Sequence, residues 1–476
     1  MTKFILNNQT IETDLPIGTT VLDFVRYHKN LKGTKIGCRE GDCGACTILV
    51  GELKGKSVKY RTMTSCLMPI ANAEGKHIVT IEGINKPNNE LTPVQQAMID
   101  ESGTQCGFCT VGFVMSLTNF CLDDTPKTCE SAISSIDGNI CRCTGYKSIE
   151  RAAFSLCDKA TERQGDGARS EPPTLAGGLN SAIEKEIVPE YFANIKGQLE
   201  TLQQDQSKIQ NPKSKIVVAG GTDLYVQKHE EMVYAKADHV LFDEELRTIS
   251  ETENQVEIGA SVVVTDLLES EIFNRLFPNL YKHLKLVSST PIRNMATIAG
   301  NFVNASPIGD MTAWFLALDA EIIFNNGRIL PLKDFYLGYK QLAKSDDESI
   351  KSIRFKKDFT HFNFEKVCKR TYLDIASVNT AISLRSEPPV LAGGFHQIVN
   401  AHVSIGGVFA TPLYLRKTSE FLHGKEINET TISQANKILQ TEIAPISDVR
   451  GTAEYKRLLA RQLFTAHFVE SFVINF

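Results

Sequence analysis

Residues 37–50 read GCREGDCGACTILV and place Cys38, Cys43 and Cys46 in one glycine-rich loop ahead of a strand-like run. A fourth cysteine, Cys66, follows further along the chain. The pattern C-x4-C-x2-C with a distant fourth cysteine suits four thiolates around the two irons of a [2Fe–2S] cluster. Glycines at positions 37, 41 and 44 let the backbone wrap closely around such a group. Zinc or free thiols are the alternative, although zinc sites usually pair one C-x2-C motif with another.

A second set of cysteines has the pattern C-x2-C … C-x-C and comprises Cys106, Cys109, Cys141 and Cys143. The last two stand in the glycine-flanked stretch GNICRCTG, residues 138–145. Taken alone this pattern fits zinc as well as iron. Beside the first set it predicts a second [2Fe–2S] cluster.

The remaining cysteines are Cys121, Cys129, Cys157 and Cys368, and they match no ligand pattern. We expect them to be small, partly buried thiols. A disulfide framework would require export, and the polar start of the chain, Met1 to Thr10, does not resemble a secretory signal. The clustered cysteines therefore favour metal ligation.

Composition bounds the other possibilities. The chain has 476 residues, a net charge of −5 and 42% hydrophobic residues. The small charge gives no reason to expect a nucleic-acid partner. No run of about 18 apolar residues is present, so we expect no membrane span. The sequence predicts a cytoplasmic protein.

Apolar patterning divides the chain into segments. A small α+β unit is expected over 1–85, with short alternating runs near Phe4, Leu6 and Ile11. Helical spacing follows over 86–160, and a glycine- and proline-rich linker over 161–182. Mixed α/β patterning covers 183–360 and 361–476, and the last part, after Asp448, reads as one amphipathic helix.

Two glycine-containing loops in the later segments are candidate sites for a pyrophosphate. A strand at Ile216–Ala219 runs into Gly220-Gly221-Thr222, where backbone N–H groups and a hydroxyl could donate. The second loop has Gly300 and Asn301, and Asp310 could accept from a ribose or ribityl hydroxyl. The alternatives are a plain strand–turn for the first loop and a helix cap for Asp310. No G-x-G-x-x-G follows a strand here, so a Rossmann-type site is not indicated.

These residues resemble a known family, the molybdenum hydroxylases of the xanthine dehydrogenase type. The iron–sulfur half of that family is matched by residues 37–50, by QCGFCTVGFVMS at 105–116 and by GNICRCTGY at 138–146. Its flavoprotein half is matched by VVAGGTDL at 217–224, TIAGNFVNASPIGD at 297–310, KVCKRTYLDIASVN at 366–379, IGGVFATPL at 405–413 and PISDVRGTAEYKRLLA at 445–460.

The resemblance implies an α+β multidomain fold. A β-grasp ferredoxin-like domain and a four-helix domain would each hold one [2Fe–2S] cluster, and a two-part α+β domain would bind FAD. It implies FAD contacts at Val217, Val218, Ala219, Gly220, Gly221, Thr222, Asp223, Leu224, Thr297, Ile298, Ala299, Gly300, Asn301, Asp310 and Asp374.

The resemblance also implies an electron relay with no catalytic acid or base of its own. A molybdopterin-binding large subunit, expected as a separate chain in a heterotetramer because the chain ends after the flavin region, would hydroxylate a purine. Electrons would then pass through both clusters to FAD and NAD⁺. The equivalent subunit of an aldehyde or N-heterocycle hydroxylase, or a stand-alone carrier, are the alternatives.

One repetition has no structural explanation in the sequence. Residues 169–178 read RSEPPTLAGG and residues 385–394 read RSEPPVLAGG. A repeated loop without repeated flanks is not a repeat of a packing unit. We expect both copies to be exposed loops.

Overall fold

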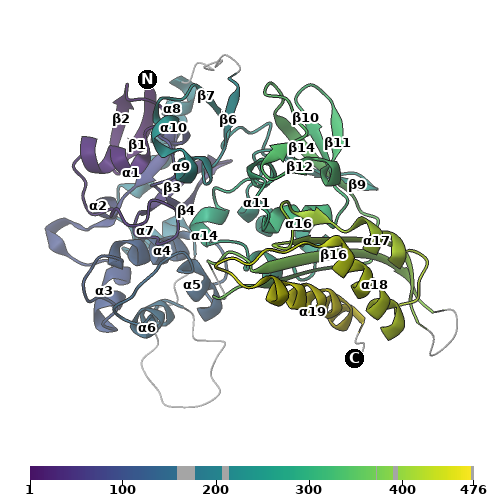
Figure 1. Cartoon of the computed structure of the whole chain (residues 1–476). Helices are drawn as coiled ribbons and strands as arrows, with labels where there is room; N and C mark the ends of the chain where they lie inside the picture. The colour runs from purple at the N-terminus through teal and green to yellow at the C-terminus, as the bar shows by residue number, and fades with distance from the viewer. Residues whose placement is uncertain (158–176, 206–213, 371–372, 390–394, 473–476) are drawn as a thin grey trace, which may run out of the picture. The chain divides into compact units, whose positions relative to one another are not determined.

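The computed structural model describes residues 1–157, 177–205, 214–370, 373–389 and 395–472 (Figure 1). The chain forms two compact units, and each is described by itself. Unit 1 comprises Met1–His239 and Ser289–Met295. Unit 2 comprises Val240–Ser288 and Ala296–Phe476. Both units mix helices and sheets, so the predicted α+β multidomain class is confirmed.

Unit 1 begins with a five-stranded sheet in the order β2-β1-β5-β3-β4. Its strands are β1 (Thr2–Leu6), β2 (Gln9–Thr13), β3 (Thr47–Lys54), β4 (Ser57–Thr64) and β5 (His77–Val79). Only β1 and β5 pair in parallel. The helical turns α1 (Val21–Asp23) and η1 (Phe24–His28) follow, and the Thr20 hydroxyl caps α1 by accepting from the Asp23 N–H at 3.2 Å. This is the expected β-grasp arrangement.

Four helices then form the second part of unit 1: α3 (Pro93–Asp100), α4 (Thr110–Leu122), α5 (Cys129–Ser135) and α6 (Lys147–Ser155). The short turns α2 (Ile81–Ile84) and η3 (Pro87–Asn89) precede them. Thr92 and Gln95 form a capping box and Pro93 occupies the first turn, so the sequence starts α3 sharply. Helix α4 is buried on almost every side and forms the centre of the group. The expected four-helix part is therefore present.

Helices α7 (Leu179–Glu184) and α8 (Phe192–Asp205) share the core formed by this sheet and the four helices. The Phe192 ring lies 5.5 Å from the Tyr60 ring and 5.3 Å from His77, both on the sheet. Helix α7 begins inside the stretch expected to be a linker, and residues 161–176 of that stretch lie outside the described residues. Unit 1 then adds β6 (Ile216–Val218), α9 (Leu224–Gln227), α10 (His229–Tyr234) and β7 (Ala237–His239), with β6 parallel to β7.

Unit 2 contains an antiparallel sheet in the order β11-β10-β14-β9-β8. The strands are β8 (Ile249–Glu251), β9 (Gln255–Gly259), β10 (Glu321–Phe324), β11 (Ile329–Pro331) and β14 (Ile350–Lys356). The helices are α11 (Val264–Glu269), α12 (Glu271–Leu276), α13 (Leu280–Leu284), α15 (Ile298–Asn304) and α16 (Asp310–Leu316). Trp314 is fully buried among phenylalanines in their common core.

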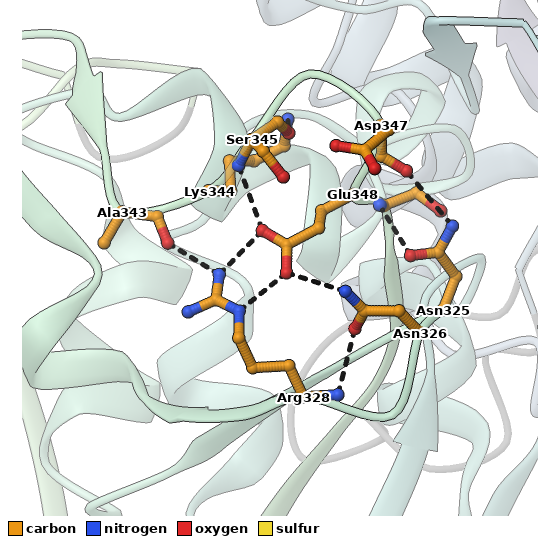
Figure 2. A network of polar contacts seen from close by, with 9 residues as sticks. Asn325, Asn326, Arg328, Ala343, Lys344, Ser345, Asp347 and Glu348 are labelled. Carbon is orange, nitrogen blue, oxygen red and sulfur yellow. Dashed lines mark hydrogen bonds and ion pairs between the residues drawn. The ribbon is translucent and has the colours of Figure 1, made fainter.

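A polar network ties the turn between β10 and β11 to the loop before β14 (Figure 2). The Arg328 guanidinium donates to both oxygens of Glu348, from Nε at 2.6 Å and from a terminal nitrogen at 2.8 Å. Asn326 and the Ser345 N–H also donate to this carboxylate. The network holds two loops of one sheet edge together.

A second sheet of unit 2 has the order β15-β16-β17-β18, formed by β15 (His361–Val367), β16 (Val378–Glu387), β17 (Gln397–Gly406) and β18 (Leu413–Tyr414). Alternate residues of β16 face opposite sides, because Ala381 joins the core with α16 whereas Ile382 joins that of α19 (Ala453–Phe472). Helices α17 (Arg416–Leu422) and α18 (Glu429–Glu442) complete this part (Figure 1). The predicted C-terminal helix is confirmed. A small β12–β13 hairpin (Tyr336–Gly338 and Gln341–Leu342) and η5 (Leu332–Asp334) lie between the sheets in sequence.

Two expectations need correction. Cys129 and Cys157 are not separate thiols but form a disulfide, because the start of α5 and the chain just beyond α6 bring their Cα atoms to 5.2 Å. The second copy of the repeated decapeptide is not wholly a loop, since Arg385–Glu387 end strand β16. Residues 390–394 of that copy and residues 169–176 of the first copy lie outside the described residues. Among the helices that the structure describes, none combines the length and apolar character needed to cross a bilayer.

Candidate cofactor sites

The first cysteine loop has the wrapped backbone that its glycines predicted. Gly41 and Gly44 have φ values of +76° and +69°, a region that glycine enters at little cost. Four backbone contacts in this loop reach sulfur. The N–H groups of Glu40, Asp42 and Cys43 point at the Cys38 sulfur at 3.3–3.4 Å, and the Cys38 N–H points at Cys43 at 3.5 Å. Such N–H donors stabilise thiolate charge.

The four sulfurs of this first set approach in pairs. A hydrogen bond between their side chains lowers the pKa of Cys38 to about 5 and raises the pKa of Cys43. The same kind of contact lowers the pKa of Cys46 and raises that of Cys66. The charge of Cys38 also acts on Cys46 and Cys66, so the two pairs lie near each other.

The second set repeats this pairing at the surface of unit 1. The sulfurs of Cys143 and Cys106 lie 3.5 Å apart, and both residues are exposed. Burial, followed by a hydrogen bond with Cys141, raises the pKa of Cys109 to about 12. The Thr144 N–H and hydroxyl contact the Cys141 sulfur at 3.5 and 3.1 Å. All eight predicted ligands are thus brought into two groups of four, each made of two pairs.

Pairing distinguishes a binuclear cluster from a single ion. In a [2Fe–2S] cluster each iron takes two protein thiolates, whereas structural zinc needs all four ligands around one point. The donors therefore fit [2Fe–2S] clusters better than zinc.

The two cysteine loops touch each other directly. The Ile140 N–H donates to the Cys43 carbonyl at 3.0 Å, and the Asn139 amide donates to the Gly44 carbonyl at 3.2 Å. Cys43 belongs to the first set, and Ile140 precedes Cys141 of the second. One hydrogen bond therefore joins the backbones that carry the two sets.

Residues 217–224, for which the resemblance implies FAD contacts, lie in unit 1 and are called here the first flavin loop. Val217 and Val218 belong to β6, the glycines form the turn, and α9 begins at Leu224. A Cβ at Gly220 would lie 1.9 Å from the Met295 carbonyl oxygen, so no other residue fits there without backbone movement. The Asn72 amide donates to the Ala219 carbonyl at 2.8 Å and fixes the start of the turn. Val217 keeps 40% of its surface exposed, which leaves apolar area beside the loop.

Residues 297–301, called here the second flavin loop, lie in unit 2 and form the start of α15. The Thr297 hydroxyl caps that helix by accepting from the Gly300 N–H at 3.1 Å. Ile298 and Ala299 are buried in the core. The Asn301 side-chain oxygen accepts from the N–H and the hydroxyl of Thr312, at 3.1 and 2.9 Å, and so caps α16.

Asp310 is the first residue of α16, but its side chain is not the helix cap. Its carboxylate accepts from the Lys366 ammonium at 2.7 Å and from the Asn379 amide at 2.6 Å. The Lys366 side chain is wholly buried, so this ion pair stands in a low-dielectric setting. The Asp374 carboxylate accepts from the N–H groups of Arg370 and Ile375 at 2.8 and 3.0 Å.

Three groups that hold these loops were not predicted from the sequence: Asn72, the pair Lys366 and Asn379, and the segment Ser289–Met295. Lys366 and Asn379 do stand within the motif quoted for 366–379. The other two gave no local signal, because their partners are distant in sequence.

Comparisons with known proteins match four successive parts of the chain to known families. Residues 4–71 match the family described as "2Fe-2S iron-sulfur cluster binding domain" and residues 80–154 match "[2Fe-2S] binding domain". Residues 194–355 match "FAD binding domain in molybdopterin dehydrogenase" and residues 364–471 match "CO dehydrogenase flavoprotein C-terminal domain".

Whole-chain relatives include xanthine dehydrogenase 1 of Arabidopsis thaliana, 27% identical over 98% of this chain and 40% of the relative. Xanthine dehydrogenase of Emericella nidulans is 29% identical over 97% of this chain and 38% of the relative. The chain thus spans 38–40% of the length of these relatives. Among solved structures, a carbon monoxide dehydrogenase from Hydrogenophaga pseudoflava covers 55% of this chain and 90% of its own, at 26% identity and a TM-score of 0.48.

The chain therefore carries two [2Fe–2S]-binding domains and an FAD-binding domain, which defines it as an iron–sulfur flavoprotein. More particularly, it is an iron–sulfur and FAD electron-transfer component of the molybdenum hydroxylase kind.

Proposed function

We propose that this chain is the electron-transfer subunit of a xanthine dehydrogenase. It would accept electrons from a molybdenum cofactor on a separate large subunit and deliver them through both clusters to FAD and then NAD⁺. The observation that carries the relay is the direct hydrogen bond between the Cys43 and Ile140 backbones, which joins the two cluster loops. The names of the full-length relatives support xanthine as the substrate of the partner.

The exposure of the two cysteine sets supports a direction for the relay. Cys106 and Cys143 are exposed, and the neighbouring Phe108 ring keeps 46% of its surface accessible. Cys46 and Cys66 are 2% and 1% exposed. A donor protein can approach the second set but not the inner pair of the first. We therefore propose that the molybdenum subunit docks over the second set, in a heterotetramer.

When bound, the clusters exchange single electrons and FAD exchanges two at a time, which links one-electron and hydride chemistry. The chain's own residues hold and tune these groups. The N–H donors around Cys38 stabilise negative charge on the first cluster loop, and wrapping by the glycine backbone excludes water from its inner side. Under this proposal the acid and base groups for purine oxidation belong to the large subunit.

For FAD, we propose contacts over Val217–Leu224 and Thr297–Asn301, with further contacts from Asp310 and Asp374. We also propose domain boundaries at 1–85, 86–160, 183–360 and 361–476 around a linker at 161–182, and a cytoplasmic location. In unit 1, Gly220 and Gly221 carry no side chains of their own, so their backbone N–H groups could come close to a pyrophosphate. In unit 2 the Asp310 carboxylate is already oriented by Lys366 and Asn379.

The test is to purify the chain with its large subunit and assay xanthine oxidation coupled to NADH formation. Metal analysis should give about four irons and one FAD per chain. Turnover of an aldehyde or another N-heterocycle instead of xanthine would replace the proposed substrate. A chain that is stable, carries flavin and associates with no molybdenum subunit would replace the proposal by a stand-alone carrier.

A further inference from the structure

The segment Ser289–Met295, called here the inserted segment, belongs to unit 1 although the chain on both sides of it belongs to unit 2. It contains the short helix α14 (Thr290–Arg293). Its residues contact all three regions of unit 1 to which cofactors are assigned. Its contacts with these regions join residues that are far apart in the sequence.

The inserted segment is anchored to the second cluster loop by a buried ion pair. The Arg293 guanidinium lies 2.6 Å from the Asp137 carboxylate, and the two side chains are 4% and 1% exposed. The same carboxylate accepts from the Thr290 N–H at 2.7 Å. Asp137 immediately precedes the loop that carries Cys141 and Cys143. A Cβ at Gly138 would lie 2.7 Å from the Pro291 ring, so the loop itself also packs on the segment.

The first cluster loop is held by the next residues of the inserted segment. The Ile292 side chain lies directly over Gly41, where a Cβ would be 2.6 Å from its terminal carbon. The Asn294 amide donates to the Thr62 carbonyl at 2.8 Å, and the Thr64 hydroxyl lies 3.5 Å from the Met295 sulfur. Thr62 and Thr64 end strand β4, which leads to Cys66.

The first flavin loop is reached by the end of the inserted segment. The carbonyl oxygen of Met295 is the atom that excludes a side chain at Gly220. Seven consecutive residues thus include contacts to the loop of the second cluster, to the first cluster loop with strand β4 before Cys66, and to the first flavin loop. A short, helical and buried piece of chain of this kind has little freedom to let one loop move without the others.

We propose that the inserted segment is a positioning element that fixes the two cluster loops and the first flavin loop relative to one another. Arg293 is the positioning residue for the second cluster and Ile292 for the first. The inference rests on the proposed electron relay and adds the part of the chain that fixes its geometry. The reduction potential of a cluster depends on backbone hydrogen bonds and solvent access. The segment would therefore also influence the reduction potentials of both clusters, although it supplies no ligand to either.

The test uses the full chain with its cofactors and three variants. Arg293→Gln removes the ion pair with Asp137, and Ile292→Ala removes the contact over Gly41. The matched control is Arg247→Gln, which breaks a comparable ion pair with Asp266 in unit 2, where the two side chains are 8% and 15% exposed. Iron content, EPR spectra of the dithionite-reduced protein and midpoint potentials are measured for each. A Cys106→Ser variant assigns the signal of the second cluster.

We expect Arg293→Gln to shift the EPR spectrum and potential of the second cluster, and Ile292→Ala those of the first, at unchanged iron content. Arg247→Gln should lower thermal stability while leaving both clusters unchanged. If Arg293→Gln fails to fold, Arg293→Lys keeps the charge and should give a smaller shift of the same signal.

If the folded Arg293 and Ile292 variants have the spectra and potentials of the parent protein, the inference is wrong. The proposed electron relay would be unaffected by that result. A parent chain that holds zinc, or shows no reduced-cluster signal, would instead overturn the proposed function.

Discussion

Replacing Gly220 by alanine tests the packing of the first flavin loop most directly. The added Cβ would lie 1.9 Å from the Met295 oxygen and 2.6 Å from its carbon, where ordinary contacts are 3.4–4 Å. Both atoms belong to the backbone, so neither can rotate away. Overpacking in a close-packed interior costs about 1–3 kcal/mol, and the backbone contact places this variant near the upper end.

A loss of about 3 kcal/mol in a unit of roughly 250 residues lowers its melting temperature by about 6–12 °C. The assay is calorimetric melting of the purified protein, with the FAD-to-iron ratio measured after desalting. Gly197→Ala is the matched control, since Gly197 lies in α8 with nothing within 4 Å of the added Cβ. That control should gain about 0.5–1 kcal/mol. A Gly220→Ala protein with parental melting and flavin content would refute the reasoning.

Three further predictions concern single side chains. Cys43→Ser should remove one cluster signal and about half of the iron while flavin stays bound, whereas Cys368→Ser should change neither; full iron in the first variant would contradict the ligand assignment. Asp310→Ala should weaken FAD retention on desalting, because the variant loses the proposed FAD contact and leaves the buried Lys366 ammonium without its carboxylate. Unchanged retention would count against a role of Asp310 in FAD binding. The Arg328 hydrogen bond lowers the pKa of Glu348 to about 2, so this carboxylate stabilises the fold above its ordinary pKa and the gain is lost as pH falls toward 2. Glu348→Gln should therefore reduce the fall of melting temperature between about pH 4.5 and 2. An unchanged fall over this pH range would show that the Arg328–Glu348 pair contributes nothing to stability.

The cysteine sets could be predicted because their information is local. Three ligands of the first set stand within nine residues, and Gly41 and Gly44 supply the backbone angles that the loop needs. The zinc alternative could not be set aside from spacing, since it depends on how sulfurs pair in space. The disulfide between Cys129 and Cys157 was missed for the same reason: its partners are 28 residues apart and each looks idle by itself.

The flavin loops were located by motif, but the atoms that support them were not. Asn301 resembled a ligand in sequence and caps a helix in the structure. The partners of Asp310 come from strands more than fifty residues away. Arg293 belongs to no recognisable motif in its own stretch of sequence, and it meets Asp137 only in the folded chain. Sequence periodicity carries no record of such long-range pairs.

The inserted segment has a consequence for the order of events during synthesis. Arg293 leaves the ribosome about 150 residues after Cys143, a delay of about 8–30 s at usual rates of translation. During that interval the second cysteine loop exists with its Asp137 carboxylate lacking the guanidinium. Any iron and sulfur inserted during that interval would enter a domain that does not yet have the ion pair between Arg293 and Asp137.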